Sequence, residues 1–177
     1  MSIALLVGIT QPALADQKDP RLDALFKGLK TSYAAAQSSR IETEIWKIWT
    51  AHNNQMIADE MQRGISFIQA GKLANAEDLF SALILADPEF AEAWNKRATI
   101  RFYRGNIDGS LADIAEVMRL EPRHFGALSG LGMIHVQAGD LAAALTAYQA
   151  AQQINPNLEN IDSLIKQLML TLRGRAT

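Results

Sequence analysis

The side chains that could carry out acid–base, metal or nucleophilic chemistry are few in this chain and lie far apart. Its 177 residues contain three histidines, His52, His124 and His135, and no cysteine. No two histidines are four residues apart, the spacing that a helical pair of zinc ligands requires. The lack of cysteine excludes disulfides, thiol catalysis and thiolate metal sites. We therefore expect capping or packing roles for the histidines, and neither a metal nor a cofactor.

Motifs for phosphate binding and hydrolysis are missing as well. There is no G-x-x-x-x-G-K-[ST] loop and no G-x-S-x-G turn. Gly126, Gly130 and Gly132 come nearest to a dinucleotide-binding pattern. Their apolar neighbours have helical spacing, however, which indicates close helix packing. We predict that the protein is not an enzyme.

Three arginines lie among apolar residues and need a charged partner or contact with water. Arg63, Arg97 and Arg101 are in segments whose other residues are mostly apolar. A buried guanidinium group is costly unless it is paired. Asp113 and Glu116, in the next predicted helix, are candidate partners. The alternative is that an arginine anchors the carboxylate of a ligand.

A regular period orders the middle of the chain. Gly71, Gly105 and Gly139 are equally spaced, and the prolines Pro88, Pro122 and Pro156 repeat with the same period. Before each glycine, apolar residues recur at helical spacing. Glycine can adopt a positive φ and so end that helix. A second helix then runs to the residue before each proline, because proline disfavours helical geometry there.

Small and bulky residues follow the same period. Gly64, Ala98 and Gly132 precede the turn glycines, and Ala76, Ser110 and Ala144 follow them. Such small residues let two helices of a pair approach closely. The bulky residues that fill the seam between the helices are Phe80, Ile114 and Tyr148.

This pattern resembles the tetratricopeptide repeat (TPR), whose helix–turn–helix unit of about 34 residues has the length of this period. Predicted units span residues 57–90, 91–124 and 125–158, and the third matches best. It carries Leu128, Leu131, Gly132, Gly139, Ala144, Tyr148, Ala151 and Pro156. The resemblance implies an all-α solenoid of stacked hairpins that binds other proteins.

The flanking segments also contain apolar residues at helical spacing. Residues 16–56 are interpreted as a degenerate repeat that caps the N-terminal end, with Trp46 and Trp49 in its core. Residues 159–173 form a predicted amphipathic helix that caps the other end, since the last unit of a solenoid otherwise exposes its stacking surface. Residues 174–177 are expected to be a frayed tail.

Residues 1–15 are predicted to be a cleaved export signal. The stretch from Ser2 to Ala15 has no charge, and Ala13 and Ala15 have the small-x-small form that signal peptidase recognises. Its apolar run is much shorter than the ~20 residues of a membrane-spanning helix, so we expect no integral membrane span. This predicts a bacterial periplasmic or secreted protein. The alternative is a cytoplasmic protein with an ordinary N-terminal segment.

The predicted binding surface is the concave groove formed by the first helix of each unit. At about 100° per residue, one side of that helix points away from its partner helix. This side carries apolar, amide and hydroxyl groups suited to an extended or helical peptide. The predicted groove residues are Met61, Ile65, Ile68, Asn95, Thr99, Phe102, Tyr103, Met133, Val136 and Gln137.

Composition restricts the class of partner. The net charge is −2, from 17 basic and 19 acidic residues, so there is no overall basic field to hold nucleic acid. We predict a non-enzymatic adaptor that binds a protein or peptide segment. The alternative is a structural component that associates with copies of itself through its ends or its groove.

Overall fold

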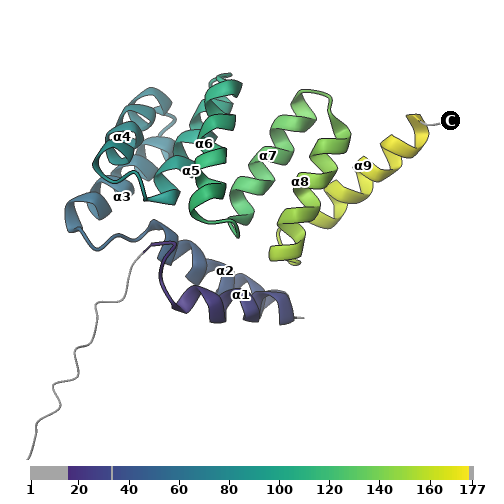
Figure 1. Cartoon of the computed structure of the whole chain (residues 1–177), viewed down its shortest axis with the longest axis horizontal. Helices are drawn as coiled ribbons and strands as arrows, with labels where there is room; N and C mark the ends of the chain where they lie inside the picture. The colour runs from purple at the N-terminus through teal and green to yellow at the C-terminus, as the bar shows by residue number, and fades with distance from the viewer. Residues whose placement is uncertain (1–15, 33, 176–177) are drawn as a thin grey trace, which may run out of the picture.

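The computed structural model describes residues 16–32 and 34–175, and in this part of the chain helices joined by turns are present and strands are not. The predicted export signal, residues 1–15, lies outside the described residues. The predicted all-α architecture of paired helices is confirmed (Figure 1). The described helices are α1 (Arg21–Thr31), α2 (Ala35–Thr50), α3 (Gln55–Gln69), α4 (Leu73–Ala86), α5 (Ala91–Tyr103), α6 (Ile107–Leu120), α7 (Phe125–Gln137), α8 (Leu141–Ile154) and α9 (Ile161–Arg175).

Helices α3 to α8 form three hairpins that stack side by side in chain order (Figure 1). Gly71, Gly105 and Gly139 end the first helix of each hairpin with φ of 69°, 79° and 77°, a backbone conformation that glycine adopts without steric cost. Capping follows at once in the last two hairpins. Asn106 accepts a hydrogen bond from Gly109 N, and Asp140 accepts one from Ala143 N, both at 3.0 Å.

Within a hairpin the two helices approach closely where the sequence has small residues. A Cβ atom added at Gly132 would lie 2.6 Å from Cε1 of Tyr148, and one added at Gly64 would lie 2.6 Å from Cζ of Phe80. The sequence pattern pairs Gly132 with Ala144, whereas the nearest atoms belong to the Tyr148 ring. The small residue therefore makes room for the bulky one.

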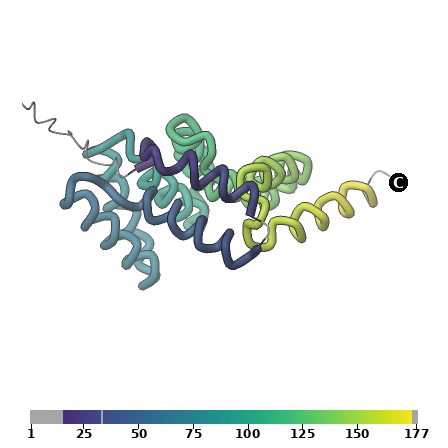
Figure 2. The backbone as a smooth tube through the Cα atoms, turned by 90° about the horizontal axis from the view of Figure 1, so that it is seen from below, coloured from purple at the N-terminus to yellow at the C-terminus, as the bar shows by residue number. Residues whose placement is uncertain are grey.

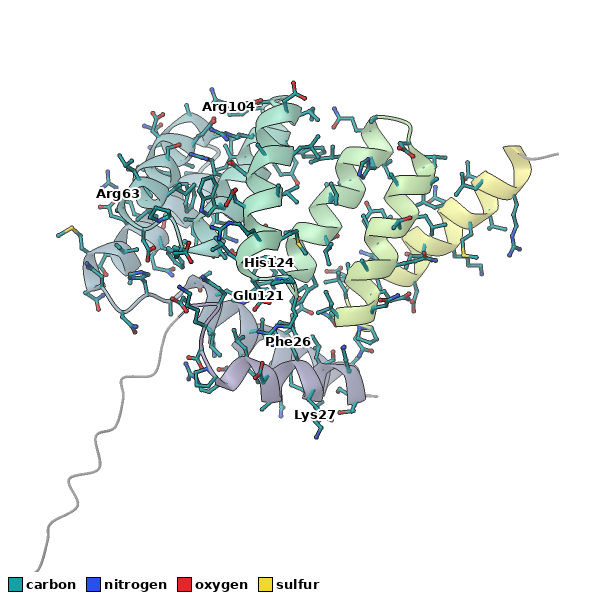
Figure 3. All side chains as sticks on the ribbon, in the orientation of Figure 1. Phe26, Lys27, Arg63, Arg104, Glu121 and His124 are labelled. Atoms are coloured by element: carbon teal, nitrogen blue, oxygen red, sulfur yellow. The ribbon has the colours of Figure 1, made fainter. Side chains whose placement is uncertain are left out.

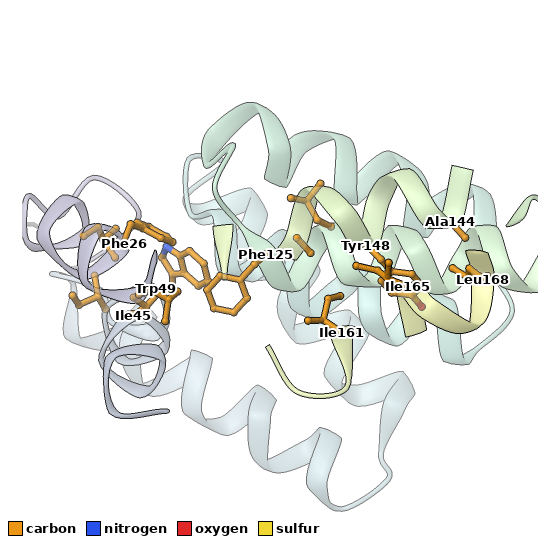
Figure 4. Packing of buried hydrophobic residues seen from close by; sticks show 14 residues of the cluster. Phe26, Ile45, Trp49, Phe125, Ala144, Tyr148, Ile161, Ile165 and Leu168 are labelled. Atoms are coloured by element: carbon orange, nitrogen blue, oxygen red, sulfur yellow. The ribbon is translucent and has the colours of Figure 1, made fainter. Parts of the chain in front are cut away.

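The sequence pattern predicts that the N-terminal hairpin, α1–α2, stacks in front of the first unit. The structure corrects this prediction. The hairpin lies across the ends of the repeats, where α1 contacts α8 and α2 contacts α5 (Figure 2). Its apolar residues share one core with the last repeat, which Figure 4 shows as a continuous cluster from Phe26 through Trp49 and Phe125 to Tyr148. Residues 16–56 therefore contain a helical hairpin, but it packs on the last repeat and not on the first.

Polar contacts fix this hairpin to three successive inter-repeat turns. Gln17 donates a hydrogen bond to the carbonyl of Glu89 before α5. Arg123, before α7, bonds Asp23 at 2.6 Å, and its guanidinium carbon lies 4.5 Å from the centre of the Phe26 ring. Figure 3 shows Phe26 beside the Glu121–His124 turn.

The third turn, before α9, is held in the same way. Asn155 donates to Glu42 at 2.9 Å, and Asn157 donates to the carbonyl of Ser32 at 3.0 Å. The hairpin therefore bridges turns that recur once in every repeat unit.

The C-terminal helix α9 packs on α8 through Ile161, Ile165 and Leu168. It starts two residues later than position 159 and continues to Arg175. The expected fraying at residues 174–177 is thus wrong for positions 174 and 175, which are helical, while 176–177 lie outside the described residues.

Candidate functional site

A cavity of about 210 Å³ opens between α5, α6 and α7. No charged side chain lines it, and most of its wall is apolar with a few hydroxyl and amide groups. Because two of its residues, Tyr103 and Met133, are 65% and 39% exposed, the cavity opens to solvent. Its lining residues are Asn95, Ala98, Thr99, Phe102, Tyr103, Ser110, Ile114, Gly126, Ala127, Ser129, Gly130, Met133, Ile134 and Leu158.

Five of the predicted groove residues meet in this cavity: Asn95, Thr99, Phe102, Tyr103 and Met133. Phe102 is half-buried, and its ring lies 5.5 Å from that of Tyr103 in an edge-to-face arrangement. The Thr99 hydroxyl donates to the carbonyl of Asn95 at 3.0 Å. The middle of the predicted groove is therefore one connected surface.

The other predicted groove residues lie elsewhere, and Met61 requires a correction. Met61 has no exposed surface, because it belongs to the core in which α5 packs against α3 and α4. Ile65 and Ile68 are half-buried against that same core. None of the three lines the cavity.

Val136, near the end of α7, lines a second cavity of about 220 Å³. This cavity is formed with side chains of α8 and α9 such as Tyr148 and Leu164. Gln137 is exposed and lines neither cavity.

Two glycines that the sequence analysis interprets as packing residues shape the cavity. Gly126 and Gly130 are one helical turn apart on α7 and both line it. A Cβ atom at Gly130 would have only Ile114 Cδ1 nearby, at 3.9 Å, so its missing side chain leaves open space. The i, i+4 spacing of these glycines was the signal that could have located the cavity. Leu158, from the turn before α9, had no such signal.

The N-terminal hairpin contacts α7 at Gly126, one of the residues that line the cavity. A Cβ atom on Gly126 would lie 2.7 Å from Cη2 of Trp46, so this indole occupies the space a side chain would need. The Lys96 ammonium lies 5.3 Å from the centre of the same indole ring, within range of a cation–π contact.

Lys96 also belongs to a buried network centred on Glu92, whose side chain has no exposed surface. The Glu92 carboxylate is 2.9 Å from His124 Nε2 and 2.8 Å from Lys96 Nζ, and it accepts a hydrogen bond from Asn95 at 3.0 Å. Burial by itself raises the pKa of Glu92, but Lys96 and the His124 hydrogen bond outweigh burial and lower it to about 2. Glu92 is therefore a buried carboxylate anion.

His124 joins this network to the start of α7. Its Nδ1 accepts a hydrogen bond from Ala127 N at 3.1 Å, so the proton of the neutral ring is on Nε2, which donates to Glu92. The expected capping and packing role for His124 is confirmed. Asn95, predicted to bind a partner, has its amide nitrogen committed to Glu92.

The half-buried arginines Arg97 and Arg101 are paired with carboxylates, as the simpler interpretation predicts. Arg97 makes a two-pronged contact with Asp113 at 2.9 and 2.7 Å, and Arg101 bonds both Asp113 and Glu77 at 3.0 Å. The other candidate partner, Glu116, binds Arg119 instead.

Arg63 is on the surface and pairs with Glu60 at 2.9 Å. No group of three His, Cys, Asp or Glu side chains that could hold a metal occurs in residues 16–32 and 34–175. Within that part of the chain, no helix is both long and apolar enough to cross a bilayer.

Comparison with known proteins agrees with this architecture. The family model of the tetratricopeptide repeat matches residues 61–102 and 95–159. A TPR repeat-containing protein of Rhizobium etli is 34% identical over 157 residues, which cover 89% of this chain and 77% of the relative.

Two solved structures show the same fold at lower identity. The first TPR of Spaghetti (RPAP3), bound to an HSP90 peptide, has a TM-score of 0.63 at 19% identity and covers 68% of this chain and 96% of its own. The Yersinia enterocolitica secretion chaperone SycD, in complex with a peptide of the translocator YopD, has a TM-score of 0.62 at 17% identity, with coverage of 67% and 96%. This chain belongs to the tetratricopeptide repeat family.

Proposed function

We propose that this chain is a non-enzymatic interaction module that binds a peptide or protein segment in the cavity between α5, α6 and α7. The observation that carries the proposal is an open, uncharged cavity of about 210 Å³ with Phe102, Tyr103 and Met133 in its wall. Exposed aromatic and methionine side chains around a recess are typical of protein-binding sites.

The size and polarity of the cavity favour one apolar anchor side chain. An apolar protein cavity of about 150 Å³ is large enough for benzene, so about 210 Å³ accommodates a phenylalanine, leucine or methionine side chain. The hydroxyl groups of Thr99 and Ser129 can bond the backbone of the bound segment. Since the lining has no cation, a peptide anchored by a carboxylate is disfavoured.

The similar structures support a peptide as the ligand. The Spaghetti TPR and SycD are both described in complex with peptides. This likeness, together with the cavity between α5, α6 and α7, supports a peptide ligand for this chain.

A peptide-display selection tests the proposal, with two matched substitutions. Thr99 and Thr146 are both exposed helical threonines whose hydroxyl bonds the carbonyl four residues earlier at 3.0 Å, but only Thr99 lines the cavity. Peptides selected on the wild-type chain should carry an apolar anchor, lose binding to Thr99→Arg and keep binding to Thr146→Arg. Equal binding to both variants would overturn the proposal.

We further propose that the protein acts outside the cytoplasm, in the bacterial periplasm or after secretion. The support is the uncharged segment that ends at Ala15, directly before the first charged residue, Asp16. Gln17, one residue further on, is already buried and bonded to the turn before α5.

A further inference from the structure

The N-terminal end of the repeat stack has an uncovered face on α3 and α4. In the next unit the equivalent face is covered by α4, where Arg97 bonds Ser81 at 3.1 Å and Arg101 bonds Glu77 at 3.0 Å. Because α1–α2 lies across the other repeats, no preceding hairpin stacks on α3 and α4 in the described part of the chain.

The repeat identifies the residues of this face. Positions one period before Arg97, Arg101 and Asp113 are Arg63, Phe67 and Leu79. They line two adjoining hollows of about 220 and 340 Å³ together with Ile57, Ala82 and Ala86. Two large apolar side chains on this end of the stack are mostly exposed, Met56 at 74% and Leu85 at 85%. The position of Leu85 corresponds to Arg119, which reaches back to Glu89 of the preceding unit at 3.3 Å.

At the opposite end of the stack, α9 also has an unpartnered side. It packs on α8 through one side only within the described residues. Lys166, Met169, Leu170 and Arg173 have the i, i+3, i+4, i+7 spacing that places them on a single face, and all four are exposed. On this face the apolar side chains of Met169 and Leu170 lie between the cations Lys166 and Arg173.

The charges of the two ends are complementary. On the α3–α4 face Arg63 is neutralised by Glu60 at 2.9 Å, so the exposed Asp78 leaves that face negative. The α9 face carries Lys166 and Arg173. Pairing α9 with another α9 would bring like charges together, whereas pairing α9 with the α3–α4 face brings opposite charges together. It also places a helix on the side of α3 and α4 where no preceding hairpin stacks.

We propose that the open α3–α4 face binds the α9 helix of a second copy of this chain, head to tail. The contact is heterologous, so a pair of copies still has one vacant end of each kind, and association extends into a chain of copies or closes into a ring. This inference goes beyond peptide binding and uses neither the cavity nor its lining.

Sedimentation velocity over a concentration series, with one variant blocked at each end, tests the proposal. Ala82→Arg places a charge on the α3–α4 face and Leu170→Asp places one on α9, and both positions are exposed. The wild-type sedimentation coefficient should rise with concentration, while each variant alone should stay monomeric. An equimolar mixture of the two variants should form a dimer that does not grow, because each molecule retains one working end.

Three results would overturn the proposal: a wild-type chain that is monomeric throughout, a mixture that stays monomeric, or Ala82→Arg associating like wild type while Leu170→Asp does not. The last result would indicate α9–α9 pairing. Asp78→Lys and Lys166→Glu should each weaken association, and a chain carrying both should recover it. Thr99→Arg should leave association unchanged, which separates this result from the peptide-binding test.

Discussion

The imidazole of His124 lies flat on the indole of Trp49, with ring centroids 4.1 Å apart and planes 9° apart. Trp49 comes from the N-terminal hairpin and His124 from the turn between the second and third units. Both are almost completely buried. This stack is therefore one of the contacts that attach the hairpin to the solenoid.

Trp49→Ala should therefore lower the free energy of unfolding by about 3–5 kcal/mol, the usual cost of removing a fully buried large aromatic side chain. Urea denaturation measures the change. Lys47→Ala, two residues earlier on the exposed side of α2, should change it by no more than about 0.5 kcal/mol. If the two variants were equally stable, the hairpin would not be attached through this stack.

Acid should destabilise the protein through Glu92. Its pKa is about 2 in the folded state, against 4.5 for an ordinary glutamate carboxyl, so its ionisation stabilises the fold above pH 4.5. That contribution is lost as the pH falls from 4.5 towards 2, and it amounts to something on the order of 3 kcal/mol.

Glu92→Gln should remove this part of the pH dependence of stability. We expect the variant to be less stable at pH 7 and its stability to change less than that of wild type between pH 4.5 and 2. Denaturant titrations at each pH provide both curves, and their difference isolates Glu92 because all other carboxylates are shared. Parallel curves would show that Glu92 is not ionised in a buried site.

The repeat period accounts for most of what could be predicted from sequence. Turn glycines, caps and seam residues repeat because each hairpin meets the same neighbours, so local spacing is enough to place them. The contacts between the N-terminal hairpin and the repeats follow no such period. They join Gln17 to Glu89 and Glu42 to Asn155, each seen only once and between residues far apart in the chain.

The candidate site likewise contains some residues that could be predicted from the sequence and others that could not. Thr99, Phe102 and Tyr103 were predictable because helical geometry alone puts them on one side of α5. Met61 has the equivalent helical position to Asn95, but it lies in the core of α3, α4 and α5 and does not line the cavity, because the surroundings of a position depend on which helices pack around it.

Gly132 should not tolerate added bulk. A Cβ atom there would lie 2.6 Å from the Tyr148 ring, so Gly132→Leu should cost about 1–3 kcal/mol through overpacking. Gly130 is a matched control on the same helix, since its nearest neighbour to an added Cβ is 3.9 Å away. Gly130→Ala should be neutral or stabilising by up to about 1 kcal/mol. Thermal unfolding of both variants checks this, and equal melting temperatures would contradict the packing at the α7–α8 seam.

The proposed export predicts a defined N-terminus for the mature protein. Signal peptidase cleavage after Ala15 should make Asp16 the first residue of the mature protein, since the enzyme recognises the small side chains of Ala13 and Ala15. N-terminal sequencing of protein from the native host decides the matter. Recovery of Met1 or Ser2 as the first residue would support the cytoplasmic alternative.

Phe102 should behave as a binding anchor in the middle of the cavity wall. It is half-buried and lies beside the exposed Tyr103, and aromatic residues at the centre of an interface commonly contribute most of the binding energy. Phe102→Ala should weaken a selected peptide by about 2 kcal/mol or more. If Phe102 were instead a core residue, the same change would lower the free energy of unfolding by about 3–5 kcal/mol and leave the affinity of the folded protein unchanged.

Phe80→Ala provides the reference for a core residue, because the Phe80 side chain has no exposed surface and packs against Gly64. Denaturant unfolding and a binding titration on both variants separate the two roles of Phe102. We expect Phe80→Ala to lose about 3–5 kcal/mol of stability, with Phe102→Ala losing clearly less and carrying the larger loss of affinity. A Phe102→Ala variant as unstable as Phe80→Ala, yet binding like wild type when folded, would remove this residue from the proposed site.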